Sequence, residues 1–168
     1  MRVTAIILAA GSSRRFGSPK QSFVIDGETL VERAMRIARE ADVDRTLVVV
    51  QPGALTEIAN RIENPEHAEG IASSIRAGVR HADGRMLILL CDQLRITSDH
   101  LRALIASDAP IVATGYSGIA GVPAIFAPRF IDELLALRGD AGARSVIEAH
   151  REEVVVIPFE DAAVDMDR

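Results

Sequence analysis

The sequence predicts an α/β fold, with three αβα layers around a mostly parallel, Rossmann-like sheet. Short apolar runs such as Ile6–Leu8 and Met86–Leu90 lack the alternation expected of a strand with one wet face. Such runs are typical of strands covered on both faces. Segments with helical spacing separate them over the first two-thirds of the chain, which favours right-handed βαβ units. With 168 residues, the chain is expected to form a single domain, 1–168.

The expected strands are short and end in polar or turn-forming residues. Pro52 and Gly53 end the second one, and Cys91, Asp92 and Gln93 end the third. The expected strands are 3–8, 46–50, 86–90, 111–113 and 154–157, with an extended segment at 122–126 and a flexible loop at 114–121.

The expected helices carry start signals at two places. Thr29 and Glu32 match a capping box, in which each side chain bonds the backbone N–H of the other residue. Thr97 is expected to cap the helix that contains Leu101 and Leu104. The expected helices are 30–41, 55–62, one from about 73 through 79, one after 97, 130–137, and one from 144 to about 150.

Composition and charge exclude several classes of protein. The apolar share of 48% argues against disorder, and a formal net charge of -5 without a basic stripe argues against nucleic acid as the main partner. Cys91 is the single cysteine, so no disulfide can form within the chain. No segment reads as a signal peptide, and no apolar run reaches the roughly 18 residues of a membrane span. We therefore expect a soluble, cytoplasmic protein without a membrane partner.

The loop after the first strand is the strongest candidate for a ligand site. Ala9–Ser13 are small residues that let the backbone approach a ligand, and Arg14, Arg15 and Lys20 follow them. Backbone N–H groups with cations behind them suit a polyphosphate. Five residues separate Gly11 from the next glycine, so the loop is not a Walker A motif. The alternative is an ordinary strand-to-helix loop with surface arginines.

Asp92 is a second candidate, because it directly follows an apolar strand. Ligands of such sheets bind at the carboxyl ends of the strands, so Asp92 and the first loop are expected at the same rim. Mg²⁺ prefers one or two carboxylates together with phosphate oxygens. Asp165 and Asp167 could supply a second carboxylate, or they could form a solvated C-terminal tail.

Five segments of the chain match known sequence motifs in order. They are Leu8–Lys20 (LAAGxSxRMGxxK), Asn64-Pro65 with Gly70 and Ser74 (NPxxxxGxxxS), Leu90–Gln93 (CDQP), Gly121–Ala124 with Phe126 (GxPxxF), and Leu137–Arg144 (LxGDxGAR). Through these motifs the chain resembles the MobA-like nucleotidyltransferase family over nearly its whole length. Their combination is most similar to the molybdenum cofactor cytidylyltransferase branch.

The resemblance implies a Mg²⁺-dependent transfer of CMP from CTP to the phosphate of molybdopterin, with release of pyrophosphate. Arg15, Lys20 and Asp92 would be the catalytic residues. Asp92, Asp165 and Asp167 would bind the metal. The implied nucleotide-binding residues are Leu8, Ala9, Ala10, Gly11, Ser12, Arg15, Lys20, Asn64, Gly70 and Ser74. A molybdoenzyme or a chaperone is a possible protein partner.

Three alternatives stay open at this point. The same transfer could use GTP with molybdopterin, or a sugar phosphate as acceptor. The chain could instead be a non-catalytic nucleotide- or cofactor-binding protein, which Leu94 in place of the family's proline would favour. By elimination, the acceptor pocket is expected at the loops Thr114–Pro123 and Gly139–Arg144.

Overall fold

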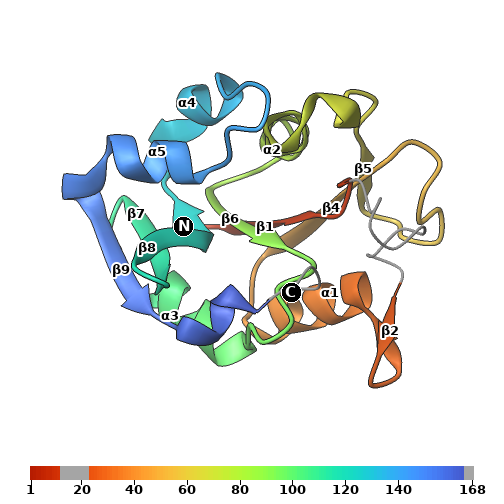
Figure 1. Ribbon diagram of the computed structural model, residues 1–168, viewed down its shortest axis with the longest axis horizontal. Coiled ribbons are helices and arrows are strands. Elements are labelled where there is room, and N and C mark those ends of the chain that lie inside the picture. Colours follow the sequence, from red (N-terminus) through yellow and green to blue (C-terminus); the bar gives the residue numbers. More distant parts are fainter. Residues whose placement is uncertain (12–22, 165–168) are drawn as a thin grey trace.

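The computed structural model describes residues 1–11 and 23–164 and contains a seven-stranded sheet (Figure 1). The strand order is β5-β4-β1-β6-β8-β7-β9, and within the described residues β8 alone runs antiparallel to its neighbours. A hairpin of β2 (Val24–Ile25) and β3 (Glu28–Thr29) forms a separate small sheet. The strands of the main sheet are β1 (Val3–Leu8), β4 (Arg45–Val50), β5 (Arg61–Glu63), β6 (Arg85–Leu90), β7 (Ile111–Tyr116), β8 (Ile119–Phe126) and β9 (Val154–Pro158).

Helices cover both faces of this sheet, which confirms the three-layer αβα prediction. One face is covered by α1 (Leu30–Glu40) and α3 (Ser98–Ala106), and the other by α2 (Ile71–Val79), α4 (Ile131–Leu135) and α5 (Arg144–Ala149) (Figure 1). Successive side chains of a strand point to opposite faces, so β1 contributes Ile7 to one core and Ile6 to the other. Within the described residues, no helix has the length and hydrophobicity needed to cross a membrane.

Two helix starts form as the sequence predicts. The Thr29 hydroxyl accepts a hydrogen bond from the Glu32 N–H at 3.0 Å, and the Glu32 carboxylate accepts one from the Thr29 N–H at 2.8 Å. The Thr97 hydroxyl accepts a hydrogen bond from the His100 N–H at 3.1 Å at the start of α3. These bonds give a partner to backbone N–H groups of the first turn, which have none within the helix itself.

The predicted helix at 55–62 is wrong. Residues 52–60 form turns, Leu55 has a φ of 52°, and β5 begins at Arg61. The Asn60 side chain donates to the Thr46 carbonyl, and the Val48 N–H donates to the Asn60 carbonyl at 3.2 Å. Pairing with the edge of β4 therefore overrides the local helical spacing.

The predicted flexible loop at 114–121 is also wrong, because β7 and β8 form a tight hairpin there. Ser117 and Gly118 have φ angles of 51° and 76°, the sign that a type I′ hairpin turn requires at both central positions. The hairpin extends the predicted strands at 111–113 and 122–126 toward each other. Its tip lies at the edge where the parallel strands end.

The sheet has a topological switch point between β1 and β6. From β1 the chain crosses by α1 to β4 on one side, whereas α2 leads back to β6 on the other side of β1. The helices of the two connections cover opposite faces, which opens a crevice outside the carboxyl ends of these two strands. Ligands of open α/β sheets bind at such a crevice.

Candidate functional site

The end of β1 and the end of β6 meet at the switch point. The Cys91 N–H donates to the Leu8 carbonyl at 3.4 Å, and the Ala9 N–H donates to the Val49 carbonyl at 2.8 Å. Ala9 and Ala10 are buried, and Gly11 is exposed. The first predicted nucleotide-binding residues therefore lead from the core to the surface at this crevice.

The Gln51 side chain fixes the start of the loop that follows β1. Its Nε2 donates to the carbonyls of Ala10 and Gly11, at 3.2 Å and 3.3 Å. The carbonyls are turned toward Gln51 at these two positions, so the chain enters the loop in a defined direction. The predicted roles of Ser12, Arg15 and Lys20 concern positions outside the described residues.

Asp92 lies at the crevice directly after β6, and its surroundings are firmly held. Asp92 is 8% exposed. The Nε2 of the neighbouring Gln93 donates to the carbonyls of Val122 and Ala162, at 3.0 Å and 3.3 Å. The Arg33 guanidinium donates to the Ile96 carbonyl at 2.6 Å. The carboxylate is therefore presented by a turn with little freedom to move.

The end of the described chain is attached beside this turn. The Leu94 N–H donates to the Val164 carbonyl at 3.2 Å. Asp165 and Asp167, the other two predicted metal ligands, lie outside the described residues. Within residues 1–11 and 23–164, no three His, Cys, Asp or Glu side chains form a metal-binding group. The Asp92 carboxylate has the oxygen donors that Mg²⁺ prefers where substrate phosphates supply the other ligands, and its role as a metal ligand stays a prediction.

Asn64 and Ser74 lie together near the start of α2. The Asn64 Nδ2 donates to the hydroxyls of Ser73 and Ser74, at 2.9 Å and 3.0 Å, and its Oδ1 accepts from the Glu66 N–H at 3.0 Å. Asn64 is 2% exposed. Its polar atoms are engaged within the chain, so its geometry suits positioning of the serines more than direct contact with a ligand.

Gly70 brings the start of α2 close to the loop after α4. Its φ is 129°, a backbone angle that residues other than glycine rarely adopt. A Cβ at this position would collide with Asp140 Oδ1 and the Gly139 carbonyl oxygen. The Ala72 N–H donates to the same Gly139 carbonyl at 3.1 Å. The segment predicted for the nucleotide and the loop predicted for the acceptor are therefore in direct contact.

Arg76 is a residue that the sequence analysis missed. It is 5% exposed, and its guanidinium binds the carboxylates of Glu66 and Glu69, at 3.0 Å and 2.6 Å, and the Leu137 carbonyl at 2.8 Å. The Gly139 N–H donates to Glu69 at 2.9 Å. The one signal in the sequence was a single arginine within an otherwise uncharged α2.

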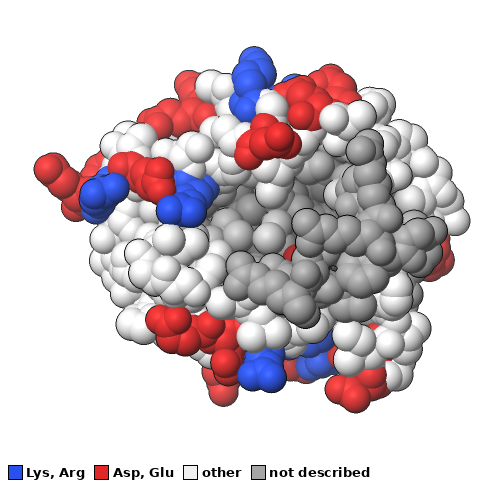
Figure 2. Space-filling model, viewed as in Figure 1, with Lys and Arg blue, Asp and Glu red and all other residues white. Residues whose placement is uncertain are grey.

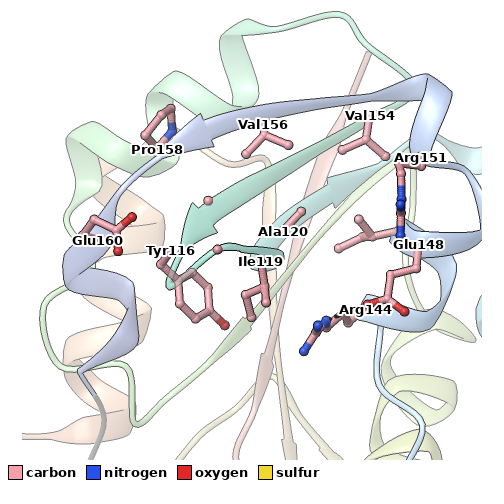
Figure 3. Close-up of a pocket in the computed structure, with 13 residues that line it drawn as sticks. Tyr116, Ile119, Ala120, Arg144, Glu148, Arg151, Val154, Val156, Pro158 and Glu160 are labelled. Carbon is pink, nitrogen blue, oxygen red and sulfur yellow. Dashed lines mark hydrogen bonds and ion pairs between the residues drawn. The ribbon is translucent and has the colours of Figure 1, made fainter.

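A groove of about 580 Å³ lies beside the crevice, between α5, β9 and the β7–β8 hairpin (Figure 3). A smaller cavity of about 190 Å³ connects it to the ends of β1 and β6, because Tyr116, Ile119 and Arg144 line both. On the face shown in Figure 2, charged side chains gather along the upper margin, on the left near α5 and along the lower margin. Both loops predicted for the acceptor thus line one continuous surface.

Comparisons with known proteins agree with this geometry. The family described as "MobA-like NTP transferase domain" matches residues 5–154. The purine catabolism protein PucB of Bacillus subtilis is 29% identical over 167 residues, which cover 86% of this chain and 80% of PucB. A probable molybdenum cofactor guanylyltransferase of Bacillus cytotoxicus is 32% identical over 111 residues, which are 61% of this chain and 55% of that protein.

Solved structures share the fold at lower sequence identity. Rv0371c of Mycobacterium tuberculosis superposes with a TM-score of 0.82 at 23% identity, over 95% of this chain and 89% of that one. A second structure of Rv0371c is a complex with manganese, with a TM-score of 0.76 at 21% identity, over 95% of this chain and 89% of that one. At these identities the likeness shows the fold.

Proposed function

The chain belongs to the MobA-like NTP transferase family of nucleotidyltransferases, and from this premise we propose that it transfers CMP from CTP to the phosphate of molybdopterin. The observation that carries the proposal is the junction of β1 and β6, where Asp92 and the start of the loop after β1 lie side by side at the switch point. We propose that this loop binds the triphosphate, and we call it the phosphate loop. A nucleoside triphosphate bound there would reach both the loop and the carboxylate.

The reaction needs positioning and charge neutralisation more than a protein nucleophile. An oxygen of the acceptor phosphate attacks the α-phosphorus of CTP, a new O–P bond forms, and the bond to the β-phosphate breaks to release pyrophosphate. Asp92 would hold Mg²⁺, which when bound neutralises charge on the phosphate oxygens. Arg15 and Lys20 would bind the triphosphate, and the backbone from Leu8 to Ser12 would approach it. Asn64, Gly70 and Ser74 would lie near the base and ribose.

A second candidate is guanylyl transfer to the same acceptor. It is favoured by the similarity to the probable molybdenum cofactor guanylyltransferase of Bacillus cytotoxicus. The choice of base depends on contacts around the start of α2, and both substrates would use the same triphosphate and metal site.

Thermal unfolding with MgCTP, MgGTP, MgATP and MgUTP in parallel tests the proposal. A ligand that binds only the folded state raises the free energy of unfolding, by about 2.7 kcal/mol when its concentration is 100 times its Kd, and the unfolding temperature rises with it. We expect the largest rise with MgCTP. The largest rise with MgGTP would favour the guanylyl candidate, and no rise with any nucleotide would contradict nucleotidyl transfer.

Asp92→Asn separates metal-dependent chemistry from nucleotide binding. The amide is nearly the same size as the carboxylate but carries no charge, so transfer of CMP should fall by at least about a hundredfold. Some CTP binding should remain, because the phosphate loop is intact. Unchanged transfer by Asp92→Asn would remove this residue from the mechanism.

A further inference from the structure

We propose that Gln93 is a positioning residue for the transfer, because its side-chain amide ties the turn that carries Asp92 to β8 and to the segment after β9. The proposal rests on the nucleotidyl transfer proposed above. It adds a residue that acts through Asp92 without touching either substrate, and that keeps this carboxylate at a fixed position relative to the segment expected for the acceptor.

The Gln93 amide joins three segments that lie far apart in the sequence. Its Nε2 donates to the Val122 carbonyl in β8 at 3.0 Å, and to the Ala162 carbonyl in the 3₁₀ helix Glu160–Ala163 at 3.3 Å. Both partners are acceptors, so both N–H groups of the amide are used and its orientation is fixed. Since Gln93 directly follows Asp92, a shift of either partner would be passed on to the turn that carries the carboxylate.

The amide connects β6 to β8 at a point where the pairing of the two strands has ended. In the described chain, this pairing stops at Ile88 and Ala124, whereas β6 continues toward the crevice as far as Leu90. The bond from Gln93 to Val122 lies beyond that point. It therefore joins the two strands again at the end of β6 where the reaction is proposed.

Other contacts hold the backbone of this turn without reaching β8. The Arg33 guanidinium in α1 donates to the carbonyls of Gln93 and Ile96, at 3.4 Å and 2.6 Å. The Leu94 N–H donates to the Val164 carbonyl at 3.2 Å. Without the amide, the turn would keep these bonds but could shift relative to β8. A substitution of Gln93 should therefore affect the reaction more than the fold.

The oxygen of the same amide argues against a role in stability alone. Gln93 is 4% exposed, and no donor within residues 1–11 and 23–164 reaches its Oε1. A buried acceptor without a donor destabilises a fold, whereas an apolar side chain of the same shape does not. An amide at this position is therefore better explained by positioning than by a gain in stability.

Arg85 provides a matched control at the opposite end of β6. Its guanidinium donates to the carbonyls of Ile105 and Ser107, at 2.9 Å and 2.7 Å. Like the Gln93 amide, it ties β6 to two backbone carbonyls of other segments. Arg85 is the first residue of β6, so it lies at the end of the strand away from the crevice. Arg85→Met therefore disturbs the fold around this strand without disturbing the proposed site.

The first experiment measures CTP binding with and without Mg²⁺ by calorimetric titration of the wild type, Gln93→Met and Arg85→Met. Mg²⁺ should tighten binding to the wild type, because Asp92 holds the ion in the proposed reaction. Methionine is nearly as long as glutamine but has no donor, so Gln93→Met should reduce this tightening at least about tenfold. Arg85→Met should keep it within about twofold. Equal tightening in all three proteins would overturn the proposal.

The second experiment measures kcat for transfer of CMP to molybdopterin by the same proteins. A small misplacement of a reacting group can lower a rate about a hundredfold, so Gln93→Met should lower kcat at least about tenfold. Arg85→Met should keep kcat within about twofold, although it also removes two hydrogen bonds. Gln93→Glu lacks the same donors and should lower kcat likewise, which provides the test if Gln93→Met does not fold. A kcat like that of the wild type in the Gln93 variants would show that Gln93 supports the fold alone.

The same substitution in the Asp92→Asn background shows whether Gln93 acts through Asp92. Where two residues act as one unit, the second substitution adds little to the first. Gln93→Met should therefore lower the kcat of Asp92→Asn by no more than about twofold. A further fall of about tenfold would mean that Gln93 contributes separately, and the positioning role would be wrong. If the wild type neither binds MgCTP nor transfers CMP, nucleotidyl transfer itself fails, and the role of Gln93 fails with it.

Discussion

Arg76 in α2 and Glu69 just before that helix form an ion pair with 2.6 Å between Nη2 and Oε1, and both residues also bind the loop after α4, Arg76 through the Leu137 carbonyl. The same carboxylate accepts a hydrogen bond from the Gly139 N–H at 2.9 Å. The Arg76 guanidinium, helped by this N–H, lowers the pKa of Glu69 to about 2. The pair therefore stays ionised at ordinary pH, and it fixes the distance between the segments proposed for the nucleotide and the acceptor.

Arg76→Met should lower the free energy of unfolding by about 2 kcal/mol, because it removes the cation that pairs with two carboxylates and one of the two guanidinium donors to the Leu137 carbonyl, the other being Arg138. Urea unfolding measures this loss. The control is Arg36→Met, since Arg36 makes comparable ion pairs with Glu28 and Glu40 on the surface, where such pairs contribute little. Equal effects of the two substitutions would show that burial of Arg76 is not what makes its contacts important.

Gly70→Ala should destabilise the protein more than a change of backbone preference alone explains. Gly70 has a φ of 129° and a ψ of -175°, a region almost restricted to glycine in which a side chain costs about 1–3 kcal/mol, and here the new Cβ also collides with Gly139 and Asp140. Gly118→Ala is the control, because Gly118 has a φ of 76° and nothing lies within 4 Å of an added Cβ. In thermal unfolding, Gly70→Ala should lower the unfolding midpoint clearly more than Gly118→Ala does. Similar losses would mean that the loop at Gly139 moves away readily.

The sequence predicts those features whose signals are local. The apolar runs before Gly11 and Asp92 predict buried parallel strands, and the capping box at Thr29 predicts the start of α1. The turn at 52–60 is set by pairing of β5 with β4, which no local pattern reports. The role of Arg76 could not be predicted for the same reason, because the fold brings its partners to it from other parts of the chain. The predicted roles of Arg15, Lys20, Asp165 and Asp167 concern positions outside the described residues and stay predictions.

His150 should make stability fall as pH rises above about 6.5. Hydrogen bonds to Glu133, 2.6 Å from Nε2, and to Glu153 raise the pKa of His150 above its ordinary value of 6.5. A raised pKa means that the folded state binds the proton more tightly. This stabilisation is complete below pH 6.5 and is lost as pH rises through the folded-state pKa. His150→Gln should therefore cost more at pH 5.5 than at pH 8.5 in urea unfolding.

His100 should act in the opposite direction, which makes it the internal comparison for His150. Burial lowers the pKa of His100, which stacks on Phe159 and lies 2.8 Å from the Thr114 hydroxyl. The folded state therefore disfavours its proton, and stability is lost as pH falls below 6.5. His100→Gln should reduce the loss on the acid side and leave the alkaline loss in place. If His100→Gln and His150→Gln changed the pH dependence of the free energy of unfolding in the same direction, these assignments would be contradicted.

Ser73 and Ser74 give the sharpest test of nucleotide binding at the start of α2, because their hydroxyls are used differently. Ser73 donates to the Gly70 carbonyl at 2.8 Å and accepts from Asn64. Ser74 also accepts from Asn64, at 3.0 Å, but none of the hydrogen bonds found among residues 1–11 and 23–164 uses its hydroxyl as a donor. The Ser74 hydroxyl can therefore still donate to a ligand.

Ser74→Ala should weaken MgCTP binding by about five- to tenfold, the effect of losing one hydrogen bond of about 1 kcal/mol. Ser73→Ala should lower the unfolding midpoint instead and leave the affinity within about twofold, because its donor is already paired inside the protein. Calorimetric titration with MgCTP measures both affinities. If the two variants bind MgCTP alike, the Ser74 hydroxyl does not contact the nucleotide, and Asn64 with its serines only holds α2 in place.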